Sequence, residues 1–129
     1  HSYYVLPFKF DSTVAQIERN KFIDAVKKEL QPTAGREKEG VRIVCGYYQP
    51  LYRLPMFQKK IAYGHNGFPW NSDIYNGNVS YSKGICPNAE YFHTKSFISF
   101  AICLYDLNIN DVNFIINSFK KVWKELKIN

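Results

Sequence analysis

The chain has 129 residues, of which 46% are hydrophobic, 17% aromatic and 22% charged. This length corresponds to about one domain, and ten Phe, ten Tyr and two Trp supply enough apolar area for a core. The composition excludes a disordered or collagen-like chain. The longest apolar run, residues 97–105, is far shorter than the roughly 20 residues that cross a bilayer, so no membrane partner is expected.

The charge is basic. Seventeen Lys and Arg against eleven Asp and Glu give +6, which raises the question of nucleic acid as a partner. The basic residues are dispersed, and most adjoin acids or fall on the polar side of a predicted helix. An acidic phosphosugar would fit the same charge as well as DNA would. The pattern therefore favours a solvated surface over nucleic acid binding.

Three cysteines, Cys45, Cys86 and Cys103, are an odd number and match no zinc-binding spacing. We interpret them as small buried hydrophobic residues in a reducing environment, so the expected location is cytoplasmic. No secretory signal pattern is present at the start of this sequence. Because position 1 is His, we expect the chain to be part of a longer protein.

The first half of the chain predicts two strands and one helix. Residues 3–10 are aromatic and β-branched with alternating pattern, and Pro7 favours an edge strand. Residues 18–30 have apolar side chains at helical spacing and predict a helix. The polar segment 31–40 predicts a loop, and residues 41–48 predict the second strand.

The second half begins with short elements. Residues 55–62 and 87–95 each begin with Pro and predict short helices. Between them, residues 63–84 form a long irregular segment, and such segments are usually functional or mobile. Residues 97–104 are almost entirely apolar, the pattern of a strand that is buried on both faces.

A long helix is predicted after Asn108, which is a good N-cap, with Asp111 in the first turn. Its lysines cluster toward the C-terminal end. The order of strands and helices predicts a two-layer α/β or α+β domain with a few-stranded sheet packed by helices. One face of the last helix is apolar, formed by Val112, Ile115, Ile116, Phe119, Trp123 and Leu126.

No self-contained active site is predicted. No phosphate-binding glycine motif precedes a helix, and the three His residues share no metal-ligand spacing. Two polar-aromatic segments remain, residues 46–52 and 63–71, which place hydroxyl, imidazole and amide groups on loops. Such loops suit a concave site for a sugar ring, and they suit equally the packing of a small domain against a neighbour.

Four blocks follow one another along the chain: H-S-Y-Y at residues 1–4, R-x-x-F-I-x-A-V-K at 19–27, G-Y-Y-Q-P-L-Y-x-x-P-x-F at 46–57 and C-P-x-A-E at 86–90. A strand and a helix containing Asp111-Val112 come after the last block. In this order the blocks resemble the C-terminal part of the DegT/DnrJ family of PLP-dependent aminotransferases, which aminate keto-sugars and keto-cyclitols. The resemblance covers nearly the whole chain.

The resemblance implies that residues 1–129 are the small C-terminal domain of a fold-type I aminotransferase. The parent enzyme would move an amino group from glutamate or glutamine to a keto-sugar, in particular a nucleotide-linked one, or to a keto-cyclitol. It would be a homodimer with active sites at the subunit interface. The groups that hold PLP would lie in the missing large domain, so no cofactor-binding or catalytic residue is assigned here and the isolated chain is expected to be inactive.

The resemblance also implies that the small domain closes one side of the active site and helps to select the sugar. The candidate substrate-binding residues are Tyr47 and Tyr52, with His65 and Asn66 of the irregular segment ranked lower. Gly46 and Tyr52 stand where the family often has His, so imidazole chemistry is not transferred to these positions. Phenol groups could still form hydrogen bonds with sugar hydroxyls or a phosphate oxygen.

A second interpretation belongs to another functional class. The chain would be a non-catalytic basic α/β binding module for a sugar, a nucleic acid or a protein partner. Salt dependence separates these possibilities, because nucleic acid binding releases counterions and weakens steeply as salt is added.

Overall fold

The computed structural model describes residues 4–30, 32–33, 36–40, 42–46 and 48–126, with backbone alone for 32–33 and 36–40. The chain divides into two compact units. Unit 1 comprises His1–Gly46 and Thr94–Asn129, and unit 2 comprises Tyr47–His93. The described part of the chain contains no helix that is long and apolar enough to cross a membrane.

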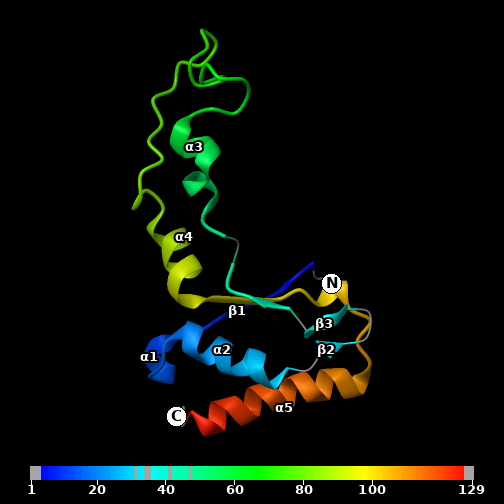
Figure 1. Ribbon diagram of the computed structural model, residues 1–129. Helices are drawn as coiled ribbons and strands as arrows, with labels where there is room; N and C mark the ends of the chain where they lie inside the picture. Colours follow the sequence, from blue (N-terminus) through cyan, green and yellow to red (C-terminus); the bar gives the residue numbers. More distant parts are fainter. Residues whose placement is uncertain (1–3, 31, 34–35, 41, 47, 127–129) are drawn as a thin grey trace. The chain divides into compact units, whose positions relative to one another are not determined.

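Unit 1 is built on a three-stranded antiparallel sheet in the order β1-β5-β4 (Figure 1). The strands are β1 (Leu6–Lys9), β5 (Phe97–Phe100) and β4 (Ile43–Val44). The predicted buried strand is thus the central strand β5, although it ends at Phe100 and is followed by a 3₁₀ turn, η3 (Ile102–Leu104). Strand β4 is shorter than the predicted 41–48, because the chain turns at Gly46, whose φ is 100°.

The segment predicted as a loop contains a small hairpin. Strands β2 (Pro32–Thr33) and β3 (Arg36–Gly40) pair antiparallel in a separate two-stranded sheet. The prediction was wrong here because the sequence R-E-K-E-G has no alternation of apolar and polar residues, which is the pattern that identifies a half-buried strand.

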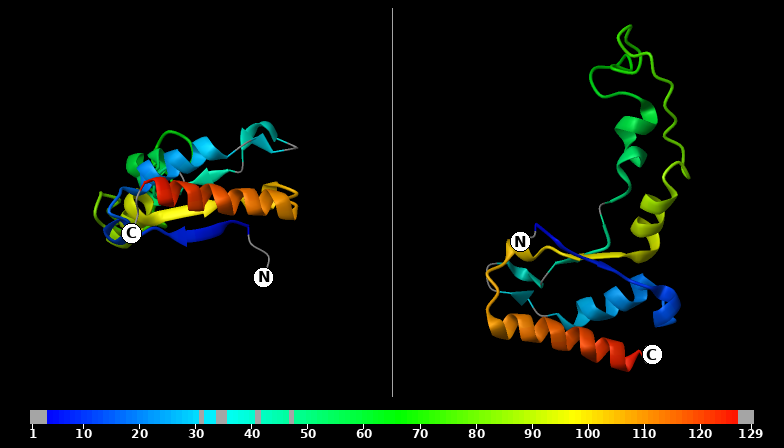
Figure 2. Two further views of the ribbon diagram at one scale, coloured as in Figure 1. Left: turned by 90° about the horizontal axis from the view of Figure 1, so that it is seen from below. Right: turned by 180° about the vertical axis from the view of Figure 1, so that it is seen from behind.

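Two helices, α2 (Arg19–Glu29) and α5 (Ile109–Glu125), pack side by side against one face of the three-stranded sheet (Figure 2). A short helix, α1 (Ser12–Ala15), precedes them and is capped by the carboxylate of Asp11. The predicted N-cap of α5 is confirmed as a complete capping box. The Asn108 side chain accepts from the backbone N–H of Asp111, and the Asp111 carboxylate accepts from that of Asn108.

The core of unit 1 lies between this sheet and the two helices, and the fold is α+β, as predicted. Leu126 and other half-buried side chains pack around it. Cys45 is half-buried, whereas Cys86 and Cys103 are exposed, so the expectation of three buried cysteines was wrong for two of them. The buried hydrophobic residues of the core are Phe10, Ala15, Phe22, Ile23, Val26, Ile43, Ile98, Phe100 and Val122.

Two buried polar side chains fix the entry into β5. The guanidinium of Arg19, which is 5% exposed, donates to the carbonyl oxygens of Phe97 (3.0 Å) and Thr94 (3.1 Å). The hydroxyl of Ser96 donates to the carbonyl of Phe10 (2.7 Å). Because carbonyl groups buried without a partner are costly, these side chains stabilise the backbone where it enters β5.

Unit 2 contains short helices and a long irregular segment. A 3₁₀ turn, η1 (Leu51–Arg53), leads into α3 (Pro55–Lys59), and α4 (Pro87–Tyr91) follows the irregular segment. A π-helical turn, η2 (Phe92–Ser96), continues α4 and contains the point after His93 where the chain returns to unit 1. The segment between α3 and α4 has no helix or strand, in agreement with the prediction for residues 63–84.

Candidate functional site

The centre of the candidate site is a hydrogen-bonded pair in unit 2. The phenol of Tyr52, in η1, donates to Oε1 of Glu90, in α4. The backbone N–H of Gly84 donates to the same carboxylate oxygen. Gly84 has a φ of 97°, which L side chains rarely adopt, so a glycine suits the turn that brings this N–H to Glu90.

The pair has a defined protonation state. Desolvation by burial, followed by the hydrogen bond to Glu90, raises the pKa of Tyr52 to about 12. The phenol of Tyr52 and then the N–H of Gly84 lower the pKa of Glu90 below its usual value. Across the neutral range the pair is therefore a neutral phenol that donates to a carboxylate. The phenol oxygen keeps lone pairs that can accept a hydrogen bond from a ligand hydroxyl.

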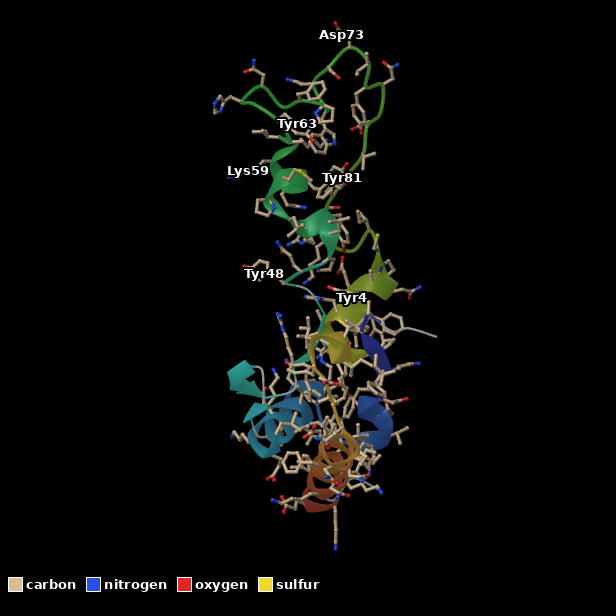
Figure 3. All side chains as sticks on the ribbon, turned by 90° about the vertical axis from the view of Figure 1, so that its right-hand side faces the viewer. Tyr4, Tyr48, Lys59, Tyr63, Asp73 and Tyr81 are labelled. Carbon is tan, nitrogen blue, oxygen red and sulfur yellow. The ribbon has the colours of Figure 1, made fainter. Side chains whose placement is uncertain are left out.

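The backbone around Tyr52 is held by a polar and aromatic cluster. Nε2 of Gln58 donates to the carbonyl oxygens of Tyr52 and Tyr81, both at 2.7 Å. The indole N–H of Trp70 donates to the hydroxyl of Tyr81 at 3.0 Å. Tyr81 is labelled in Figure 3. Phe57 packs against both rings, with centroids 5.3 Å from Tyr81 and 6.1 Å from Trp70. These contacts connect α3 to two separate parts of the irregular segment, at Trp70 and at Tyr81.

The other predicted residues occupy a different turn. His65 and Asn66 are exposed, and the turn that carries them is closed by a β-bridge between Tyr63 and Phe68. The carbonyl of Asn66 accepts from the side-chain amide of Asn71 (3.2 Å). Among the described residues, no hydrogen bond joins this turn to the pair described above. His65 and Asn66 therefore belong to a turn of their own, separate in the chain from η1 and α4, which carry the hydrogen-bonded pair.

Of the two leading candidates, only Tyr52 can be placed, since Tyr47 lies outside the described residues. Sequence reasoning included Glu90 in the C-P-x-A-E block and missed its role as the partner of Tyr52. It also missed Gln58 and Tyr81. Nothing in their local sequence patterns indicates these contacts, because they join residues 23 and 38 positions apart.

A second feature lies entirely in unit 1. An open apolar groove of about 800 Å³ runs between α5 and the sheet. Its lining includes Phe8 of β1 and Ile116, Phe119 and Trp123 of α5. The predicted apolar face of α5 is therefore only partly in the core, and the position that is most buried on this helix, Val122, was not predicted. The three predicted sugar-binding residues that the structure describes, Tyr52, His65 and Asn66, do not line this groove.

The described residues include no group of His, Cys, Asp and Glu side chains that could hold a metal ion. Comparisons with protein-family models, with curated proteins and with solved structures find no match for this chain.

Proposed function

We propose that the chain is the C-terminal, substrate-side domain of a PLP-dependent aminotransferase that acts on a keto-sugar or keto-cyclitol. The observation that carries the proposal is the hydrogen bond between Tyr52 and Glu90. These residues belong to the third and fourth blocks of the family resemblance and are 38 positions apart. Their contact gives both blocks a shared structural role.

The buried Arg19 adds support from the second block. In the resemblance it is the first residue of R-x-x-F-I-x-A-V-K, and its guanidinium anchors the backbone at Thr94 and Phe97, shortly after the fourth block. Phe22, Ile23 and Val26 of the same block are core residues. Three of the four blocks thus contain residues with long-range contacts, which is what a shared fold would require.

The pair of Tyr52 and Glu90 has the chemistry of a polyol-recognising group. A carboxylate accepts strongly from hydroxyl groups, and a phenol can donate and accept at once. In the proposed enzyme the pair would orient hydroxyl groups of the sugar ring, while the keto group faces the large domain. The role proposed for Tyr52 is therefore binding and orientation.

The described residues of this chain do not fit a PLP site. PLP is held through a lysine in an enclosed pocket, and no described lysine side chain is buried. Lys95, in η2, is exposed and lies 3.9 Å from a carboxylate oxygen of Glu18. The proposal therefore places PLP, its lysine and its phosphate-binding groups in a large domain upstream, and a homodimer would complete the active site.

The test begins with the parent gene upstream of His1. We expect a coding region for a large domain with the lysine and aspartate of a PLP site, and a purified parent protein with the absorbance of bound PLP. The parent should transfer the amino group of glutamate or glutamine to a nucleotide-linked keto-sugar. Tyr52→Phe should raise the KM for the keto-sugar and leave the half-reaction with the amino donor unchanged.

As a matched control, Tyr63→Phe removes an exposed hydroxyl from the same unit and should change neither parameter. A parent that contains no PLP-binding domain contradicts the proposal outright. Equal effects of Tyr52→Phe on both half-reactions would contradict the assignment of Tyr52 to the sugar.

The binding-module alternative has one observation in its favour. The chain has a net charge of +6, and three lysines, Lys9, Lys120 and Lys124, line the groove of unit 1. A nucleic-acid-binding module would bind duplex or single-stranded DNA with an affinity that falls steeply between low and moderate salt. We expect no such binding, and a steep salt-dependent titration would favour the alternative.

A further inference from the structure

The groove of unit 1 is an apolar surface that the described chain leaves uncovered. Phe8 is 44% exposed, Ile116 is 45% exposed and Trp123 is 38% exposed, although all three adjoin the core. Val112, Ile116, Phe119 and Trp123 follow one another at helical spacing along α5. A continuous apolar strip of this kind marks a binding surface more often than an ordinary solvated face.

The described charged residues at the groove all have one sign. Among the residues that the structure describes, its lining contains Lys9, Lys120 and Lys124 and no Asp or Glu. In the part of the chain that the structure describes, Lys121 is paired with Glu29 at 2.8 Å, but neither Lys120 nor Lys124 forms an ion pair. An occupant with carboxylates beside an apolar strip would complement this surface.

The dimensions fit one α-helix. Val112 and Lys124 are twelve residues apart on α5, so the groove follows that helix for about 18 Å. A volume of about 800 Å³ over this length gives a mean cross-section of about 45 Å². That is close to half the cross-section of a helix with a diameter of about 10–12 Å including side chains. A helix lying in the groove would be half embedded.

The openness of the groove distinguishes a helix from an acyl chain. A hydrocarbon chain has no polar side and would leave apolar surface in water, whereas an amphipathic helix would cover the groove and keep its polar side solvated. A second copy of the chain offers the same lysine-lined face, and the described part of that lining has no carboxylate to complement it.

We propose that this groove binds an acidic amphipathic helix of a partner protein. The apolar strip of the partner would cover Phe8, Ile116 and Trp123, and its flanking carboxylates would lie against Lys9, Lys120 and Lys124. The net charge of +6 would favour approach of such a partner. This site uses no residue of the pair in unit 2 and is independent of the proposed enzymatic role.

The probe is a helix-stabilised 18-residue peptide with Leu at helical spacing and Glu on both flanks of the Leu strip. A matched peptide has Lys in place of every Glu. Binding is read from the fluorescence of Trp123 in a Trp70→Phe background, which leaves a single Trp in the chain. We expect a blue shift with saturable binding for the acidic peptide and at least roughly tenfold weaker binding for the basic one.

Two variants test whether the peptide binds in the groove. Lys120→Glu/Lys124→Glu should weaken binding of the acidic peptide by about tenfold or more, and Ile116→Asp should abolish the blue shift. The matched control, Lys27→Glu/Lys28→Glu, makes the same charge change on the exposed side of α2 and should weaken binding less than about threefold at moderate salt.

Three outcomes would overturn the proposal. The first is equal affinity for the acidic and basic peptides. The second is an equal loss of affinity for the acidic peptide in the two double-lysine variants. Binding would then depend on the overall positive charge of the chain and not on this groove. The third is burial of Trp123 in the absence of peptide. This would be seen if the chain dimerises through the groove, or if dodecanoate shifts the Trp123 fluorescence at a lower concentration than the acidic peptide does.

Discussion

Two groups that titrate at opposite ends of the pH scale share one hydrogen bond at Tyr52 and Glu90. The lowered pKa of Glu90 means that the folded state prefers its carboxylate, and the raised pKa of Tyr52 means that it prefers the neutral phenol. Each preference also contributes to stability, because a difference in pKa between the folded and unfolded states makes the free energy of unfolding depend on pH. The pair should therefore stabilise the fold most between the two titrations.

The acid limb can be tested with Glu90→Gln. The carboxylate contributes stability above the unfolded pKa, near 4.5, and this contribution is lost as the pH falls through the lower folded pKa. We expect the stability difference between wild type and the variant, measured by urea unfolding, to shrink as the pH falls from about 6 to 3. Asp73→Asn, at the tip of the irregular segment in Figure 3, is the control and should show no comparable trend.

The alkaline limb has the opposite sign. The contribution of the Tyr52 phenol is complete below pH 10 and is lost as the pH rises through about 12. The stability difference between wild type and Tyr52→Phe should accordingly shrink between these values. A constant difference across both limbs would show that the hydrogen bond contributes nothing to the folded state.

A buried guanidinium is the second feature at this scale. Arg19→Met should lower the free energy of unfolding by about 2–4 kcal/mol, because the carbonyl groups of Thr94 and Phe97 lose their donor inside the structure. Lys21→Met removes an equal charge from an exposed position of the same helix and should change stability by less than about 0.5 kcal/mol. Similar values for the two variants in urea unfolding would contradict a structural role for Arg19.

At the scale of elements, sequence patterns predicted those structures that depend on local rules. The helices α2 and α5 follow from apolar spacing, and the start of α5 follows from Asn108 and Asp111. The β2–β3 hairpin was missed because its charged residues have no apolar alternation. The early end of β4 was missed because the conformation of Gly46 is not encoded in the strand pattern.

The candidate site was predictable only in part, for a related reason. Tyr52 was identified through a block resemblance, but its partner Glu90 lies 38 residues later in the chain and becomes a neighbour only when α4 packs near η1. The face of α5 was recognised as apolar, yet periodicity cannot distinguish a face that packs in the core from one that lines an open groove. Both the partner of Tyr52 and the exposure of this face depend on contacts between residues that are far apart in the sequence.

The cap of α5 gives a prediction for this scale. Asn108→Ala should lower the free energy of unfolding by about 1 kcal/mol, because the N–H groups of Asn110 and Asp111 lose their acceptor. Asn117→Ala, an exposed position within the same helix, should be neutral or slightly stabilising because Ala is the better helix former. Thermal unfolding followed by circular dichroism distinguishes the two, and a loss for Asn117→Ala as large as that for Asn108→Ala would contradict the capping role.

At the scale of the whole molecule, the division into units follows from the register of one strand pair. In the sheet, Val44 of β4 lies opposite Ser99 of β5, and the strands run antiparallel. Extending this register places Gly46 opposite Phe97, at the point where a short hairpin turn would normally join two such strands. Unit 2, residues 47–93, occupies the place of that turn. Unit 1 is thus a sheet-and-helix scaffold, and unit 2 is an insertion that carries the candidate site.

This topology predicts that unit 1 folds without the insertion. Replacing residues 47–93 with a short Asn-Gly linker should leave the β4–β5 pair, the Arg19 contacts to Thr94 and Phe97, and the core intact, since every core residue belongs to unit 1. The shortened chain should unfold cooperatively and retain helical circular dichroism.

Trp123 reports directly on the core of unit 1. It is the only Trp left after the deletion, and it packs against Phe22 with ring centroids 5.7 Å apart. Its fluorescence should report the same transition midpoint as circular dichroism. As a control for the cut site, the same linker inserted between Asp73 and Ile74, with no residues removed, should also be tolerated because that stretch is exposed. A shortened chain that is unfolded while the insertion variant folds would show that unit 1 depends on unit 2, and the insertion interpretation would be wrong.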